Sequence, residues 1–287
     1  MSINKVIPFR WNIEKYSEFQ ALIPDGKNST ANQWLLDNLL ESAAKILTFA
    51  GDAHLYFVGR SPESYHDLLK GIFYKTIFQE RFSIFQFSAR FTSIKYLNQK
   101  HPYAIDNLYY YMQKVGICPT SILHRKGKTV FVDLVDTGST FEFLIKLLQF
   151  FAAKEKIDWK TIQEKIGIIG ILKEEKTSPN TWRWQQDDYW KGLLKQRNIK
   201  NVTIDPYFWG CLGNWQNKVT VSFGPKRWSN PIAQIPVRKK ENLNGLQTGH
   251  LLFKAGLERS NKKVFKKHLA NPKAMQFAHV RNYLSVL

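Results

Sequence analysis

The sequence has little cysteine and no residue pattern typical of a structural metal site. Its two cysteines, Cys118 and Cys211, have no Cys-x-x-Cys partner, and its seven histidines show neither His-x-x-x-His nor His-x-His spacing. These absences argue against a disulfide framework and against a zinc centre. We expect two reduced thiols, as is usual for a cytoplasmic protein.

Long apolar runs are also missing. The first residues, MSINKVIPFRWNIEKY, carry charges where a secretory signal would need an apolar segment. No stretch approaches the roughly 18 uncharged apolar residues that predict a transmembrane helix. We therefore expect a cytoplasmic protein without a membrane span.

Acidic residues are scarce compared with basic ones. The 287 residues include 42 Lys and Arg against 23 Asp and Glu, which gives a net charge of +19. Residues 225–287 hold 13 of the basic and 2 of the acidic residues, so +11 of this charge lies there. A field of this sign attracts nucleic acid, phosphorylated metabolites or anionic membranes, although it can also serve solubility alone.

What the sequence does contain is an alternation of strand and helix patterns. Strand patterns occur at 55–58, 81–91, 127–135, 165–172 and 201–204. Helical patterns occur at 32–50, 61–73, 104–115, 139–153 and 185–197. This alternation predicts an α/β fold with a mostly parallel twisted sheet flanked by helices. We place a helical N-terminal extension at 1–50, the α/β core at 51–224 and a basic C-terminal extension at 225–287.

The stretch VFVDLVDTGST, residues 130–140, allows three interpretations. Asp-Thr-Gly can be the catalytic turn of an aspartic protease, a phosphate cradle or simply a turn. A protease of this length needs a second copy of the motif, which the sequence lacks, and the residues after the turn have helical spacing. A strand that ends in glycine and hydroxyl residues before a helix directs backbone N–H groups at one point, as an anion site requires. In a parallel sheet this point lies at the carboxyl ends of the strands, where ligands bind.

The same stretch resembles the phosphoribosyl-pyrophosphate (PRPP) signature of type I phosphoribosyltransferases, most closely in their purine-salvage branch. The resemblance implies that Thr137, Gly138, Ser139 and Thr140 hold the ribose 5′-phosphate. It places Asp136 near the nucleobase as a general base, although an aspartate here can also cap the following helix. Val132 and Asp133 align with an acidic pair that binds the ribose hydroxyls and, indirectly, Mg²⁺, so one carboxylate of that pair is missing. Gly59, Arg60 and Ser61, after the strand pattern at 55–58, align with the pyrophosphate loop.

Two further groups of residues suggest contact with a base or with nucleic acid. Four lysines recur on one side of a predicted helix, namely Lys262, Lys263, Lys266 and Lys267. Three tryptophans, Trp182, Trp184 and Trp190, surround Arg183. The lysines suit nucleic-acid phosphates or a plain solvated surface, and the tryptophans suit stacking or core packing.

Two functions follow as hypotheses. The first is an Mg²⁺-dependent enzyme that binds PRPP or another phosphorylated nucleotide and transfers phosphoribose to a nitrogenous acceptor. The second is a transfer-impaired module of the same fold, or an effector of a bacterial defence complex, that binds a nucleotide, RNA, DNA or a nucleoprotein complex through its basic surface. A homodimer is a further expectation.

Overall fold

The sheet is the centre of the molecule. The structure is a computed structural model, and it describes residues 5–23, 31–89, 93–174, 184 and 192–287. Within these residues five strands form one sheet in the order β2-β1-β3-β4-β5, and every neighbouring pair is parallel. The strands are β1 (His54–Val58), β2 (Phe82–Phe85), β3 (Thr129–Leu134), β4 (Ile166–Lys173) and β5 (Ile199–Ile204). The predicted α/β fold with a mostly parallel sheet is confirmed.

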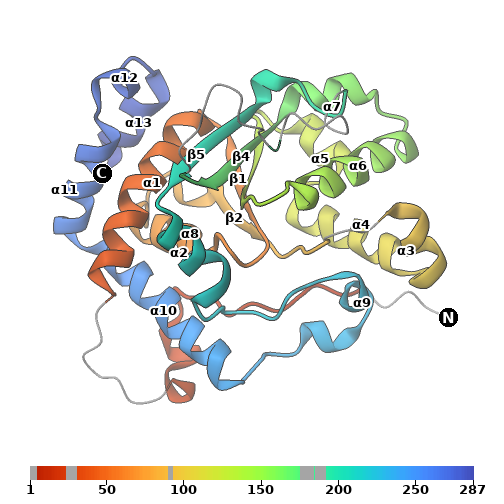
Figure 1. Cartoon of the computed structure of the whole chain (residues 1–287), viewed down its shortest axis with the longest axis horizontal. Coiled ribbons are helices and arrows are strands. Elements are labelled where there is room, and N and C mark those ends of the chain that lie inside the picture. The colour runs from red at the N-terminus through yellow and green to blue at the C-terminus, as the bar shows by residue number, and fades with distance from the viewer. Residues whose placement is uncertain (1–4, 24–30, 90–92, 175–183, 185–191) are drawn as a thin grey trace.

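Helices cover both faces of the sheet (Figure 1). One group consists of α3 (Ile94–Lys100), α4 (Ala104–Val115), α5 (Pro119–His124), α6 (Ser139–Lys154) and α7 (Trp159–Lys165). The other consists of α1 (Gln33–Ala50), α2 (Glu63–Ile72), α8 (Pro206–Gly210), α10 (Lys240–Leu257), α11 (Arg259–Leu269), α12 (Pro272–Met275) and α13 (Ala278–Val286). The short helix α9 (Pro225–Trp228) packs against α4. None of the helices in the described ranges is both long and apolar enough to cross a membrane.

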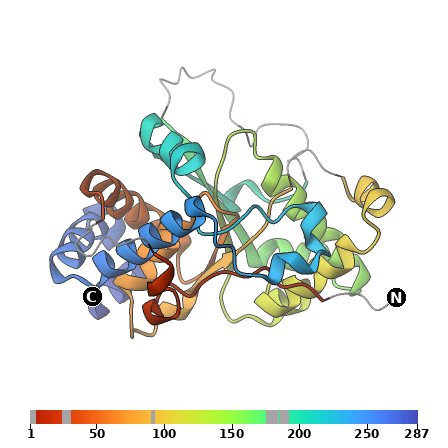
Figure 2. The same cartoon turned by 90° about the horizontal axis from the view of Figure 1, so that it is seen from below.

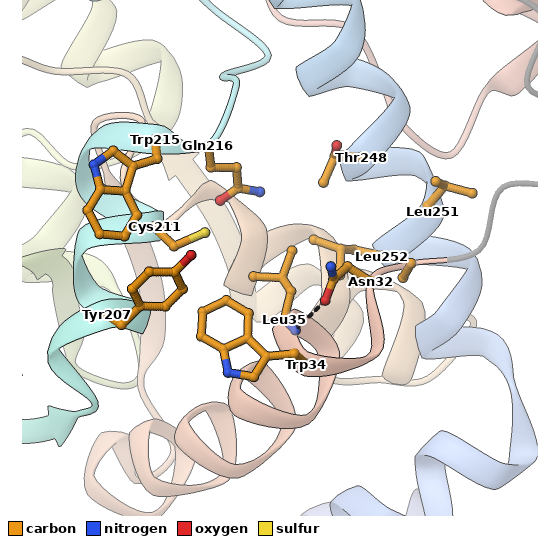
Figure 3. A pocket seen from close by; sticks show the side chains of 11 residues that line it. Asn32, Trp34, Leu35, Tyr207, Cys211, Trp215, Gln216, Thr248, Leu251 and Leu252 are labelled. Atoms are coloured by element: carbon orange, nitrogen blue, oxygen red, sulfur yellow. Dashed lines mark hydrogen bonds between the residues drawn. The ribbon is translucent and has the colours of Figure 1, made fainter.

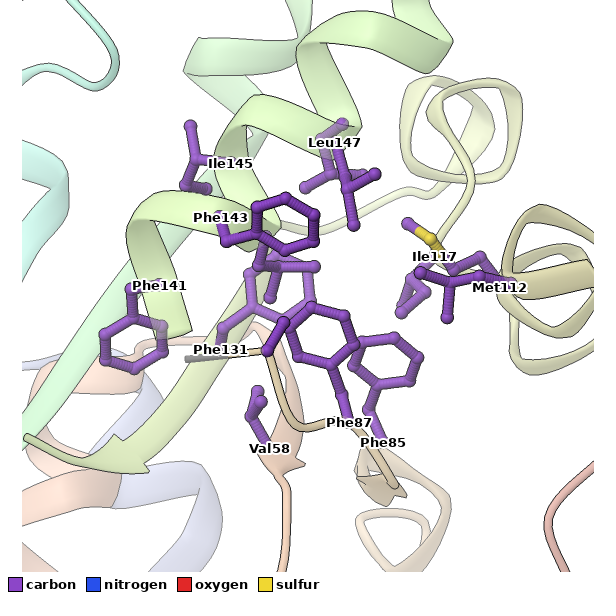
Figure 4. Close-up of a cluster of buried hydrophobic side chains, with 14 of the residues drawn as sticks. Val58, Phe85, Phe87, Met112, Ile117, Phe131, Phe141, Phe143, Ile145 and Leu147 are labelled. Carbon is purple, nitrogen blue, oxygen red and sulfur yellow. The ribbon is translucent and has the colours of Figure 1, made fainter. Parts of the chain in front are cut away.

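Aromatic side chains fill the space between α4, α6 and the sheet (Figure 4). Phe85 and Phe131 come from the strands, Phe87 from the chain that follows β2, and Phe141 from α6, and each is at most 2% exposed. The rings of Phe85 and Phe87 stack with their centres 5.2 Å apart. This apolar layer fixes the position of α6, and with it the loop that precedes α6.

The C-terminal helices share the core on the opposite face. Phe265 of α11 and Tyr283 of α13 are fully buried, and their ring centres lie 6.2 and 5.5 Å from that of Phe73. Leu39 and Leu47 of α1 belong to the same cluster. The boundaries near residues 50 and 224 stay predictions, but the segments on either side of them bury one common hydrophobic cluster.

Glycines let α2 and α10 touch backbone to backbone. A Cβ on Gly71 would lie 2.1 Å from the Phe253 carbonyl oxygen, and one on Gly256 would lie 2.5 Å from that of Leu68.

The N-terminal segment runs beside residues 218–235 in both views (Figures 1 and 2), and Phe9 N donates to Ala233 O over 2.8 Å. Distant parts of the chain therefore converge below the sheet, next to the carboxyl ends of β1 and β3.

Several local predictions need correction. The strand predicted at 81–91 is only four residues long, because the chain leaves β1 after Phe85 to pair with residues near Phe223. Helices α5 and α7 were not predicted, since each is too short for a clear apolar period. The helix predicted at 185–197 lies mostly outside the described residues.

Candidate functional site

The strand order reverses between β1 and β3, which makes this position the topological switch point of the sheet. From β1 it crosses through α2 to β2, whereas from β3 it crosses through α6 to β4 on the other side. The two connections leave on opposite faces and open a crevice at the carboxyl ends of these two strands, the usual place of a ligand in such sheets.

A cleft of about 370 Å³ occupies this point, and we call it the switch-point cleft. It is lined by Gly59, Arg60, Ser61, Gln86, Phe87, Ser88, Asp133, Thr140, Gly213, Asn214, Lys218, Val221, Ser222 and Phe223. The ends of β1, β2 and β3 form its floor, and a segment between α8 and α9 forms its outer wall. Residues far apart in sequence thus meet in one polar space.

Gly59, Arg60 and Ser61 reach the cleft directly from the end of β1. Gly59 has a φ of +76°, and a Cβ there would lie 3.0 Å from the Phe87 carbonyl oxygen, so the turn requires glycine. Arg60 Nη1 donates to the Thr220 carbonyl oxygen over 3.3 Å, which joins the turn to the outer wall. The helix predicted at 61–73 begins two residues later, because α2 starts at Glu63 after Pro62 and has no side-chain cap.

Asp133 lies on the floor of the cleft and Val132 lies on the other side of the sheet. Successive residues of a strand face opposite ways. Val132 is fully buried in the hydrophobic cluster beneath α1 and α2, whereas Asp133 shares the face of Phe131, is 8% exposed and lines the cleft. A carboxylate at position 132 would therefore be buried among apolar side chains rather than placed beside Asp133.

The Asp-Thr-Gly-Ser-Thr loop borders the cleft and a small adjoining depression of about 40 Å³. Gly138 has a φ of +82°, and a Cβ there would lie 2.5 Å from Cε3 of Trp184. The Trp184 ring thus packs on the loop, and its Nε1 donates to Asn201 Oδ1 over 3.1 Å. This contact favours the packing interpretation of Trp184, while Trp182 and Trp190 lie outside the described residues.

Asp136 neither caps α6 nor lines the switch-point cleft. The N-cap of α6 is Gly138, without a side-chain hydrogen bond, and Asp136 is exposed and borders the small depression. The alternative of a capping role for Asp136 is therefore wrong. Its role as a general base stays a prediction.

Arg60 lies within electrostatic reach of two other cationic side chains near the cleft, Lys218 and Arg227. Burial lowers the pKa of Lys218, Arg60 lowers it further, and Glu63 and Asp133 partly oppose both. Burial and Arg60 also lower the pKa of Arg227, which donates to the Ser222 carbonyl oxygen over 3.4 Å. Mutual repulsion among these cations is relieved when an anion binds between them.

The side chain of Glu63 is hydrogen-bonded to the outer wall of the cleft. It is 4% exposed, and its Oε1 accepts a hydrogen bond from Val219 N over 2.9 Å. Burial raises its pKa to about 7, against the opposing fields of Arg10 and Lys218. Glu63 thus holds the segment that carries Lys218 beside the cleft.

The structure brings some predicted site residues together and leaves others apart. Gly59, Arg60, Ser61, Asp133 and Thr140 line one cleft, and Thr137, Gly138 and Ser139 adjoin it. The four lysines lie on α11, which lines no part of the cleft and packs against α1. Lys263 and Lys267 are exposed there, while Lys262 and Lys266 are half-buried.

Sequence reasoning missed the outer wall, residues 213–223. Its signal was the change to a segment rich in glycine and tryptophan after Gly210. Only a fold that returns this segment to the ends of β1 and β3 makes Lys218 a site residue.

Comparison with protein-family models, with curated proteins and with solved structures gives no significant match to this chain.

Proposed function

We propose that the protein binds PRPP or a related phosphorylated nucleotide in the switch-point cleft. The observation that carries this proposal is the convergence of Arg60, Asp133 and Thr140 on one cleft, although Arg60 follows β1, Asp133 lies in β3 and Thr140 lies in α6. Arg60 suits a phosphate because its guanidinium donates in a planar fork. The N-terminus of α6 adds roughly half a positive charge beside Thr140.

Mg²⁺ would reach the cleft together with the ligand. The described residues contain no group of three or more side chains that could hold a metal ion. A single carboxylate is nevertheless sufficient for Mg²⁺ when substrate phosphates supply the other ligands, and Asp133 is so placed. Bound there, Mg²⁺ would neutralise a pyrophosphate leaving group.

Transfer to an acceptor would follow from the same arrangement. The C1–O bond to pyrophosphate breaks, pyrophosphate leaves with the electron pair, and a nitrogen of the acceptor forms the new bond to C1. The proton of that nitrogen would pass to Asp136 or to solvent, and Arg60 and Lys218 would hold the departing phosphates.

A second candidate keeps the binding and drops the transfer. It is favoured by the position of Val132, whose side chain occupies the apolar face where no second carboxylate can assist Asp133. Binding of PRPP without release of pyrophosphate, tested over a panel of nitrogenous acceptors, would favour this candidate.

Calorimetry with PRPP and Mg²⁺ tests the proposal. We expect Arg60→Gln to weaken binding by roughly tenfold to a hundredfold, because one charge-assisted hydrogen bond to phosphate is lost. Lys263→Gln on α11 removes the same charge at an exposed site and should bind as the wild type does. Asp133→Asn should remove most of the Mg²⁺ dependence of binding. Absence of PRPP binding by the wild-type protein, or equal losses in Arg60→Gln and Lys263→Gln, would show that the proposal is wrong.

A further inference from the structure

A second, larger pocket opens between α1, α8 and α10 (Figure 3), and we call it the aromatic pocket. Its volume is about 640 Å³. Figure 3 shows side chains from these three elements and from the π-helical turn Cys211–Trp215 around one common space. None of the described residues that line it has an acidic or basic side chain.

Three large rings on its wall are unusually exposed. Trp34, Tyr207 and Trp215 are 40%, 63% and 60% exposed. The ring of Tyr207 lies 5.3 Å from that of Trp34 and 4.9 Å from that of Trp215, between centroids. The planes of Trp34 and Tyr207 are inclined by 66° and those of Tyr207 and Trp215 by 52°, so the three rings form an angled aromatic surface open to solvent. A contiguous surface of this kind marks a binding site more often than a scattered apolar residue does.

Uncharged polar groups stand beside the rings. Gln216 Nε2 donates to Ser64 Oγ over 2.8 Å, which fixes the orientation of the amide. Thr248 donates its hydroxyl proton to the Asn244 carbonyl oxygen over 3.0 Å, so the hydroxyl oxygen can accept a hydrogen bond. Burial raises the pKa of the Cys211 thiol, although Lys218 opposes it, so this thiol stays neutral near pH 7. The pocket thus suits a flat, uncharged group with hydrogen-bonding edges.

The turn Cys211–Trp215 separates this pocket from the switch-point cleft. Cys211 and Trp215 line the aromatic pocket, while Gly213 and Asn214 line the cleft. A ligand that carries both a planar group and phosphates would match this pair of neighbouring sites and the net charge of +19.

We propose that the aromatic pocket binds a nucleobase, which stacks on one ring among Trp34, Tyr207 and Trp215 and contacts the other two with its edge. The base belongs to a free nucleotide or to a single-stranded nucleic acid, because both present the same planar face to the rings. The inference goes beyond PRPP binding and does not require it, since PRPP has no base and a nucleoside has no phosphate. The two proposals can therefore fail separately.

Equilibrium dialysis of the full chain with adenosine and with uridine tests the inference. We expect both nucleosides to bind the wild type, and Trp215→Leu and Tyr207→Leu to weaken binding roughly tenfold each, because an aromatic contact with the base is lost. Tyr103→Leu removes a tyrosine of similar exposure, 51%, outside the pocket and should leave binding unchanged. Trp34→Phe keeps a ring and should retain more affinity than Trp34→Leu.

Two further titrations identify the source of the base. Tighter binding of a short oligothymidylate than of thymidine 5′-monophosphate, measured at constant salt, would assign the pocket to single-stranded nucleic acid. Equal binding would assign the pocket to a free nucleotide. Either result supports the proposal if Trp215→Leu weakens the binding of these ligands. The proposal is wrong if neither nucleoside binds, or if the pocket variants bind as the wild type does. A change of sedimentation coefficient in Trp215→Leu without a change in nucleoside affinity would instead make this surface a contact between copies of the chain.

Discussion

Replacement of Asp67 by alanine should lower the free energy of unfolding by about 3–5 kcal/mol, since it leaves a buried guanidinium without its anion. Both Asp67 oxygens accept hydrogen bonds from Arg10 Nη2, over 2.8 and 2.9 Å. The side chain of Asp67 is 1% exposed and that of Arg10 is 12% exposed. Burial alone would raise the pKa of Asp67, but Arg10 and His66 outweigh it and hold the pKa below its ordinary value.

The loss should be large because this ion pair joins three segments. Arg10 belongs to the N-terminal segment and Asp67 to α2, and a Cβ on Gly249 of α10 would lie 2.5 Å from Asp67 Oδ2. Solvent cannot replace the missing carboxylate without separating these segments.

Chemical denaturation with two control variants tests this prediction. Lys45→Ala breaks the exposed pair with Glu41, whose charged atoms are 2.7 Å apart, and should cost less than about 1 kcal/mol. The double substitution Arg10→Met with Asp67→Leu removes both charges and should cost less than Asp67→Ala alone. A loss in Asp67→Ala no larger than that in Lys45→Ala would contradict the buried character of the pair.

The Glu63→Gln variant should be more stable than the wild type, by a difference in the free energy of unfolding that grows as the pH increases. The Glu63 carboxyl ionises near its ordinary pKa of 4.5 when unfolded, whereas burial raises the pKa to about 7 in the folded protein. Between these values the unfolded chain releases a proton that the folded chain still holds. Glu63 therefore lowers the stability of the wild type progressively over this window, by about 3 kcal/mol in total.

Glutamine keeps the acceptor for Val219 N but has no proton to release. We expect the stability difference between Glu63→Gln and the wild type to grow from pH 4.5 to pH 8 and then to level off. Unfolding curves at four pH values in this range measure it, and contributions from groups that do not interact with Glu63 cancel because both proteins contain them. A constant difference would mean that burial does not raise the pKa of the Glu63 carboxyl in the folded protein.

The resemblance of residues 130–140 to a PRPP signature pointed to the edge of the sheet where the switch-point cleft lies, but it could not describe that cleft. Local patterns predicted the strand before Asp133 and the helix after Gly138, because apolar period and turn chemistry act over a few residues. They gave no information on Lys218 or Asn214, since these belong to an irregular segment whose position depends on Glu63 and Arg60. The aromatic pocket was missed for the same reason, as Trp34 and Trp215 are 181 positions apart.

The sequence alone determined the α/β class, the parallel sheet and the excess of basic charge, because each follows from local periodicity or composition. The tertiary structure decided which residues meet. It placed Asp133 on the cleft and Val132 in the core, since adjacent residues of a strand face opposite sides of the sheet. It also returned residues 213–223 to the ends of β1 and β3, a contact between distant segments that depends on buried hydrogen bonds and packing and that no local pattern encodes.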